Sequence, residues 1–196
     1  MIMNKTLSER QKEIIKASLE LIAEEGIQGL TIKNIANRIG VVESAIYRHF
    51  ENKTRILIAL LDTIKEHSIP ANSGEGVDSI TRIEQRLINH FKTFSSFPAL
   101  VSVVFAEDLF QNDTSLVNKT KEMMQKSIAD MGAIIKDGQN QGEIRTDIDS
   151  EHFAIMITGT IRMLVKQWKM TGYSFDLIKK GDKLIRSMKI ILKPEI

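Results

Sequence analysis

Apolar residues recur along most of the chain at intervals of three and four positions, a spacing that predicts helices rather than strands. Residues 31–39 show it clearly, because isoleucine and alanine fall at i, i+3, i+4 and i+7 after Thr31, a favourable N-cap residue. Gly40 then ends the helix, since glycine readily adopts the positive φ of a sharp turn. The pattern restarts over residues 42–50, whose apolar side comprises Ala45, Ile46 and Phe50. Two short helices joined by a tight turn are the layout of a helix-turn-helix.

The same periodicity predicts helices on both sides of this motif. A first helix should run from a capping box formed by Ser8 and Gln11 to Gly26. A helix capped near Asn52 should extend to about residue 67, and the turn-rich residues 68–78 follow it. Further helices are expected at residues 79–97, 99–110, 114–141, 150–171 and 175–192. We therefore predict an all-α fold of about nine helices, with an N-terminal three-helix domain followed by a helical bundle.

The helix-turn-helix stretch is more basic than the rest of the chain. Residues 31–55 carry five cations and two carboxylates, whereas the net charge of all 196 residues is only +2. Duplex DNA attracts such local clusters of cations, because binding releases its condensed counterions. An ordinary helical pair with a charged face has the same features. Charge and periodicity alone therefore leave both interpretations open.

A longer match in this region favours DNA binding. The run GVVESAIYRHFENK is preceded by TIKNIA and by a helix ending in EEGIQGL. This sequence resembles the N-terminal DNA-binding signature of the TetR/AcrR family of bacterial transcriptional repressors over roughly residues 8–65. The rest of the chain resembles the family only in length and helical character. The resemblance implies a DNA-binding domain at residues 1–52, a connecting helix at 53–67, and a helical ligand-binding and dimerisation domain at 68–196.

The resemblance also implies which residues meet DNA. Thr31 and Lys33 would lie beside the phosphate backbone at the start of the first helix of the motif, and Lys53 would lie beside it at the start of the next helix. Glu43, Ser44 and Ala45 would face base edges. The full expected set is Thr31, Lys33, Glu43, Ser44, Ala45, Tyr47, Arg48, His49 and Lys53. Val42 departs from the family, which usually has Ser or Thr there; valine cannot cap the helix or donate to phosphate, but its methyl groups could meet a thymine methyl.

The predicted bundle is rich in phenylalanine and methionine, which suit a cavity for an apolar or aromatic small molecule. The expected lining residues are Phe91, Phe94, Phe105, Glu107, Met123, Met131, Met163 and Trp168. Glu107 or Asp108 could pair with a cation on the effector. Such stripes are also typical of an ordinary core. The alternative is therefore a regulator that answers to a protein partner or has no effector.

A single helix-turn-helix reads too few base pairs for genomic specificity, so we expect a homodimer on a near-palindromic double-stranded operator. The last two predicted helices are the candidates for the interface, through Ile155, Gly159, Arg162, Leu184, Ile185 and Met188. Gly159 would allow two helices to approach closely. Tolerance for a glycine inside one chain explains this residue nearly as well.

Several function classes are not expected. The chain has no cysteine, which excludes disulfides and thiolate metal sites and fits a reducing cytoplasm. It shows no His-x-x-x-His spacing, nucleophile motif or glycine-rich phosphate loop, so we predict no enzyme, metal site or cofactor. Residues 153–165 are too short to span a membrane and include Arg162, and the N-terminus lacks an export segment. We expect a cytoplasmic transcriptional regulator, a repressor released by a small apolar or aromatic effector.

Overall fold

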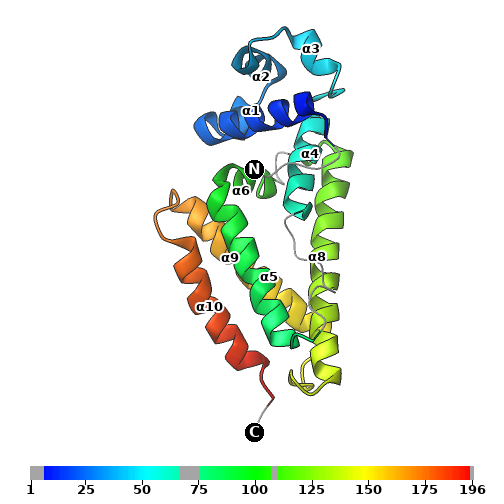
Figure 1. Cartoon of the computed structure of the whole chain (residues 1–196), viewed down its shortest axis with the longest axis vertical. Helices are drawn as coiled ribbons and strands as arrows, with labels where there is room; N and C mark the ends of the chain where they lie inside the picture. The colour runs from blue at the N-terminus through cyan, green and yellow to red at the C-terminus, as the bar shows by residue number, and fades with distance from the viewer. Residues whose placement is uncertain (1–6, 67–75, 107–109, 195–196) are drawn as a thin grey trace. The chain divides into compact units, whose positions relative to one another are not determined.

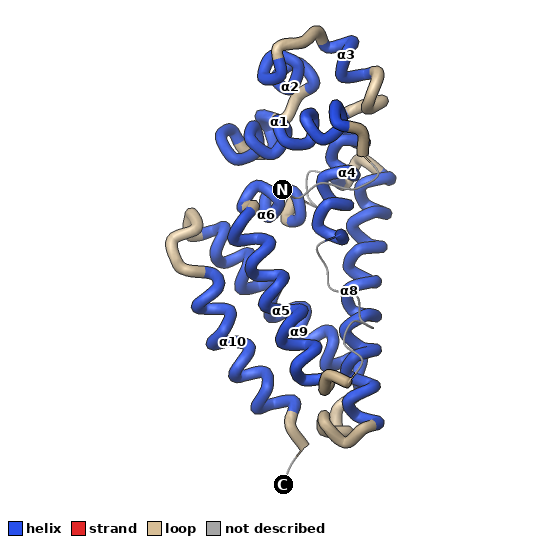
Figure 2. The backbone as a smooth tube through the Cα atoms, viewed as in Figure 1, coloured by secondary structure: helices blue, strands red, loops and turns tan. Residues whose placement is uncertain are grey.

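The computed structural model describes residues 7–66, 76–106 and 110–194. Within these ranges the regular structure is helical and contains no strand (Figure 2), which confirms the all-α prediction. The helices are α1 (Glu9–Glu25), η1 (Ile27–Gly29), α2 (Ile32–Ile39), α3 (Glu43–Tyr47), α4 (Lys53–Glu66), α5 (Ser79–Ser96), α6 (Pro98–Val104), α8 (Thr114–Asn140), α9 (Ser150–Met170) and α10 (Leu177–Leu192).

The helices form two compact units. The first contains residues 1–67 and 97–121, and the second contains residues 68–96 and 122–196. Residues 97–121, which the sequence placed with the ligand-binding domain, thus pack with the N-terminal helices. The continuous helix α8 (Figure 1) contributes its first residues to one unit and the remainder to the other.

Local capping explains where the first helices begin and end. The Ser8 side chain accepts a hydrogen bond from the Gln11 backbone N–H, and the Gln11 side chain accepts one from the Ser8 N–H, so the predicted capping box is confirmed. Gly26 ends α1 with φ at 72°. Buried α1 side chains face the core of the first unit, where α6 packs against α1 and α4. Helix α2 packs against α1, and α3 packs against α2, so α1 positions both short helices.

Two helices are shorter than the sequence predicted. The second helix of the motif ends at Tyr47 rather than at residue 50, so Arg48 and His49 lie in the following turn. The helix that begins at Pro98 ends at Val104 rather than at residue 110. It begins at Pro98, one residue before the predicted start, and proline suits the first helical position because that position needs no backbone N–H.

The second unit is built around close contact between α5 and α10, which lie side by side (Figure 1). Gly181 of α10 makes this approach possible, since a Cβ there would lie 2.4 Å from Cδ2 of the Phe91 ring. The turn between α9 and α10 is closed by Trp168, whose Nε1 donates to the Phe175 carbonyl at 2.8 Å. The Trp168 ring also packs edge-on against Tyr173.

Candidate nucleic-acid interface

The turn between α2 and α3 has the geometry of a helix-turn-helix. The Thr31 hydroxyl accepts from the Asn34 backbone N–H at 3.0 Å, so Thr31 caps α2 as predicted. Gly40 ends α2 in the left-handed region at φ 79°, ψ 36°, which favours glycine. The Asn34 side chain donates to the Gly29 carbonyl at 2.8 Å, which fixes α2 to the preceding turn.

Helix α3 buries one side and exposes the other. Ile46 is buried, as is Phe50 just beyond the helix, whereas Tyr47 is 51% exposed. Glu43 and Ser44 are also exposed, and Ala45 is partly buried. Val42 stands at the N-cap and makes no side-chain capping bond, as expected for a valine in place of the family's usual Ser or Thr. The exposed side of α3 is therefore polar and aromatic.

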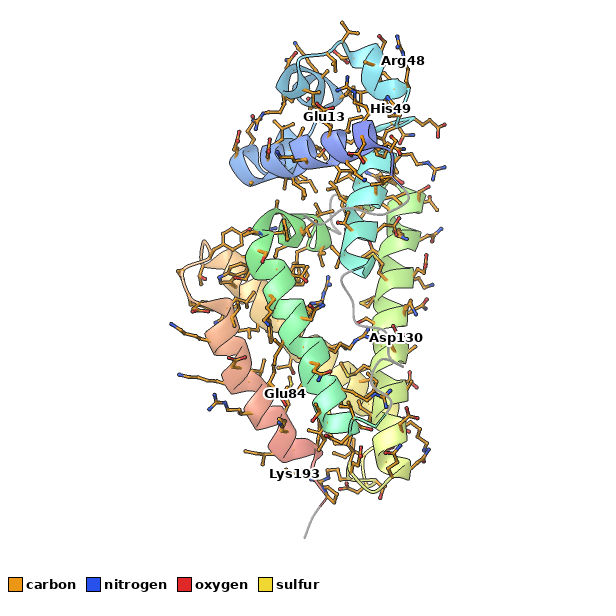
Figure 3. The ribbon with its side chains drawn as sticks, in the orientation of Figure 1. Glu13, Arg48, His49, Glu84, Asp130 and Lys193 are labelled. Carbon is orange, nitrogen blue, oxygen red and sulfur yellow. The ribbon has the colours of Figure 1, made fainter. Side chains whose placement is uncertain are left out.

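The residues after α3 are tied to α1. The Gln11 Nε2 donates to the His49 carbonyl at 3.2 Å, while Gln11 Oε1 holds the Ser8 N–H at 3.0 Å. Figure 3 shows His49 and Arg48 at the end of α3, with His49 close to α1. The sequence identified Gln11 only as a capping residue. Its second role joins positions 38 residues apart, for which no local signal exists.

Ion pairs divide the cations of residues 31–55 into two groups. Arg38 donates to Glu24 at 2.5 Å and lies 3.7 Å from Glu20, and the Glu24 carboxylate raises the Arg38 pKa. Arg55 lies 3.7 Å from Glu51. Lys33, Arg48 and Lys53 form no ion pair with any residue in the described ranges. The charge count of the sequence therefore overstates the cations available to a duplex.

The N-terminus of α4 carries the third of these cations. Asn52 Oδ1 accepts from the Arg55 backbone N–H at 3.0 Å, which confirms the predicted cap near Asn52. Lys53 occupies the first position of α4 and is partly buried, and this burial lowers the Lys53 pKa below its usual value. Free N–H groups at a helix N-terminus favour an anion at this place.

Of the eight residues predicted to bind an effector, six lie in the second unit. Phe91, Phe94, Met131 and Trp168 are buried in the second unit, and Met123 is partly buried there. Phe105 belongs to the first unit, and Glu107 lies outside the described residues, as does Asp108. Met163 is 66% exposed, unlike the other predicted lining residues of the second unit.

Two of the buried aromatic residues stabilise the core of the second unit. The Phe91 ring fills the contact between α5 and α10 at Gly181, and Trp168 uses its only polar atom to close the α9–α10 turn. Phe91 and Trp168 therefore contribute to the packing of the second unit, and a cavity lined by them stays a prediction. Phe94 packs instead against His90, with ring centroids 4.6 Å apart in an edge-on arrangement.

Several polar side chains of the second unit were not among the predicted site residues. Arg86 of α5 lies 3.4 Å from Asp130 of α8, which Figure 3 labels, and Lys126 approaches the same carboxylate at 3.1 Å. Burial, together with the charge of Arg86, lowers the His90 pKa to about 4. His90 is therefore neutral at physiological pH. The only sequence signal for this interaction was the spacing of four residues between Arg86 and His90.

The residues predicted for the dimer interface fall on two different faces. Ile185 and Met188 are only 2% and 7% exposed, so they pack inside their own unit, which corrects their assignment to an interface. Leu184 and Arg162 are partly buried. The exposed apolar side chains of α9 are Ile155, Met156, Met163 and Met170. Gly159 lies on the same exposed face, with open space where its Cβ would be.

Two other kinds of site are absent from the described ranges. No cluster of three or more histidine, aspartate or glutamate side chains could hold a metal ion. None of the described helices combines the length and the apolar character that a membrane crossing requires.

Known families match almost the whole chain. Residues 14–60 match the family described as bacterial regulatory proteins, tetR family. Residues 53–190, more than half of the chain, match the C-terminal region of YsiA-like proteins within the same group. The chain belongs to the tetR family of bacterial regulatory proteins. The protein is thus a DNA-binding transcriptional repressor of this family, and residues 14–60 lie within its first unit.

Individual relatives support this membership. The fatty acid metabolism regulator protein of Bacillus subtilis (strain 168) is 28% identical over 175 residues, which cover 88% of this chain and 90% of that protein. The probable acrEF/envCD operon repressor of Escherichia coli (strain K12) is 24% identical over 195 residues, covering 94% and 87%. The structure of FadR from Bacillus subtilis with stearoyl-CoA has a TM-score of 0.74 at 24% identity and covers 92% of this chain and 98% of that chain. These tetR-family relatives are regulators rather than enzymes, in agreement with the prediction.

Proposed function

We propose that this tetR-family protein is a repressor that binds a near-palindromic DNA operator as a homodimer. The observation that carries the proposal is the first unit itself, in which the exposed side of α3 is accompanied by Lys33, Arg48 and Lys53 without ion-pair partners among the described residues. Exposed α3 side chains would read base edges, and the cations would meet phosphates. Thr31, Glu43, Ser44, Ala45, Tyr47 and His49 complete the proposed contact set.

The exposed apolar face of α9 supports the homodimer. Ile155, Met156 and Met163 lie on this face, and several exposed large apolar side chains on one helix face suit an interaction site. Gly159 lies among them and leaves room for a facing helix. Such a dimer would present two recognition helices about 34 to 36 Å apart, or a multiple of that distance, to two half-sites.

We further propose that a small apolar molecule releases the protein from DNA, and that a long-chain acyl group is the first class to test. Two similarities support this choice: the Bacillus subtilis relative is a fatty acid metabolism regulator, and the similar FadR structure holds stearoyl-CoA. In the second unit, Phe94 and Met131 supply apolar surface, and Arg86 and His90 supply polar groups. Control by a protein partner, or by no effector, is the competing proposal.

The operator must be found before the effector can be tested. Selection of tight-binding duplexes from a random pool should return sequences with two inverted half-sites. A pool that shows no enrichment, or a single half-site only, would contradict dimeric operator recognition.

Stearoyl-CoA, stearate and free coenzyme A should then be titrated against the protein–operator complex. We expect stearoyl-CoA to weaken operator binding about 100-fold, which corresponds to a coupling of about 2.7 kcal/mol. By reciprocity, operator DNA must weaken the binding of the same compound by the same factor. Unchanged operator affinity with all three compounds would reject the acyl class and favour the partner-protein alternative.

A further inference from the structure

The first turn of α4 is bonded to the N-terminus of α8. The Thr54 hydroxyl donates to Asp113 Oδ2 at 2.5 Å. The other oxygen of this carboxylate, Oδ1, accepts from the backbone N–H groups of Ser115 and Leu116 at 3.0 and 3.2 Å. A single carboxylate therefore caps α8 and holds α4 at the residue that follows Lys53.

This connection has little freedom to move. Threonine is β-branched, so its side chain is stiff about the first torsion. Asp113 is fixed by the two N–H groups it caps, and its own N–H donates to the Phe110 carbonyl at 2.8 Å. The Thr54 hydroxyl, followed by the Leu116 and Ser115 amides, holds the Asp113 pKa below its usual value. Asp113 therefore stays ionised and continues to accept these bonds at neutral pH.

A second polar contact joins the same two helices farther along. Lys119 Nζ lies 2.6 Å from Asp62 Oδ1, and both side chains are largely shielded from solvent. Asp62 is eight residues beyond Thr54, roughly 12 Å along α4 at 1.5 Å per residue. The Asp62–Lys119 pair thus fastens α4 to α8 well away from Lys53, and it provides a natural control for the Thr54–Asp113 bond.

We propose that Asp113 is a positioning residue for DNA binding: through the Thr54 hydroxyl it holds the first turn of α4 where Lys53 meets a phosphate. The inference rests on the proposed phosphate contact of Lys53. The same carboxylate caps α8, and α8 continues into the second unit. A displacement of α8 therefore changes the position of Lys53. Helix α8 thereby transmits a signal to DNA in addition to the connecting helix α4.

The test compares Thr54→Val with Thr54→Ser, since Asp113 variants would also lose the cap of α8. The probe is a labelled random-sequence duplex of about 30 base pairs, titrated over a range of salt concentrations. Thr54→Val should lower duplex affinity about tenfold and reduce the salt slope by about one, as Lys53→Ala does. Thr54→Ser keeps the hydroxyl and should behave like the parent protein.

Two further variants separate positioning from general stability. Lys119→Met breaks the other contact between the same helices and should lower the melting temperature while leaving the salt slope unchanged. The double variant Lys53→Ala with Thr54→Val should bind no more weakly than Lys53→Ala alone, because both changes remove one contact.

Any of the following results would overturn the inference. A parental salt slope in Thr54→Val, or losses that add in the double variant, would show that Thr54 does not act through Lys53. If the parent protein bound no duplex in a salt-dependent way, the proposed function would fail together with the inference. A reduced slope in Lys53→Ala with no change in Thr54→Val would overturn the inference alone.

Discussion

In the first unit the exposed side of α3 is polar or aromatic, whereas in the second unit the exposed side of α9 is rich in isoleucine and methionine. Both helices bury an apolar side in their own core. The exposed sides of the two helices differ, and each suits a different partner. The polar side of α3 suits a hydrated, charged duplex, whereas the apolar side of α9 suits a second apolar surface. The uncovered side of a helix therefore indicates its partner, while its buried side indicates only that the unit folds.

The strongest test of this comparison uses two glycines, one on a buried face and one on an exposed face. Gly181→Leu would force a side chain into the Phe91 ring, because even a Cβ would lie 2.4 Å from Cδ2. We expect a loss of more than about 3 kcal/mol in the free energy of unfolding, measured by chemical denaturation. Gly159→Ala is the matched control, since its Cβ meets open space and should stabilise the helix by about 0.5 to 1 kcal/mol. Equal effects at the two positions would contradict the assignment of the two faces.

The next largest effect concerns His90, a partly buried residue of the second unit. The His90 pKa is about 4 in the folded protein, below its ordinary value of 6.5, so the unfolded state binds the proton more readily. Stability should therefore fall as pH drops from about 6.5 to about 4, by up to about 3 kcal/mol. His90→Gln should remove this part of the pH dependence, as measured by the difference between parent and variant melting curves. Parallel curves for the two proteins would show that His90 titrates normally.

Local capping was predictable from sequence because each cap depends on residues a few positions apart. Thr31 with Asn34, Ser8 with Gln11, and the left-handed Gly40 all behave as predicted. These features determine the helix-turn-helix, so its fold and the exposure of Tyr47 followed from periodicity and turn chemistry. The packing of residues 97–121 in the first unit did not follow from them.

Other features depend on contacts between distant residues. Arg38 is paired with a carboxylate 14 residues away, and Asp113 with a hydroxyl 59 residues away. Helix α10 has apolar residues on more than one side, so its period did not reveal that Ile185 is buried while Ile190 is exposed. Whether such a side chain is buried depends on which side of its helix a neighbouring helix covers. The sequence of one chain does not show directly where that neighbouring helix lies.

A smaller effect is expected at the exposed face of α9. Gly159→Leu places a bulky side chain on this face, which would obstruct a closely packed partner helix. We expect the dimer dissociation constant to rise by roughly tenfold, equivalent to about 1.4 kcal/mol, as measured by sizing with light scattering over a concentration series. Gly159→Ala adds little volume and should remain dimeric. An unchanged dimer in Gly159→Leu would remove this residue from the interface.

The most direct test of the central claim is the salt dependence of duplex binding by three single variants: Lys33→Ala, Lys53→Ala and Arg38→Ala. Lys33 and Lys53 have no ion-pair partner among the described residues, so losing either should reduce the salt slope by about one. Arg38 is occupied by Glu24 and Glu20, so its loss should leave the slope unchanged. A reduced slope for Arg38→Ala, or a parental slope for both lysine variants, would contradict the account of which cations this protein presents to DNA.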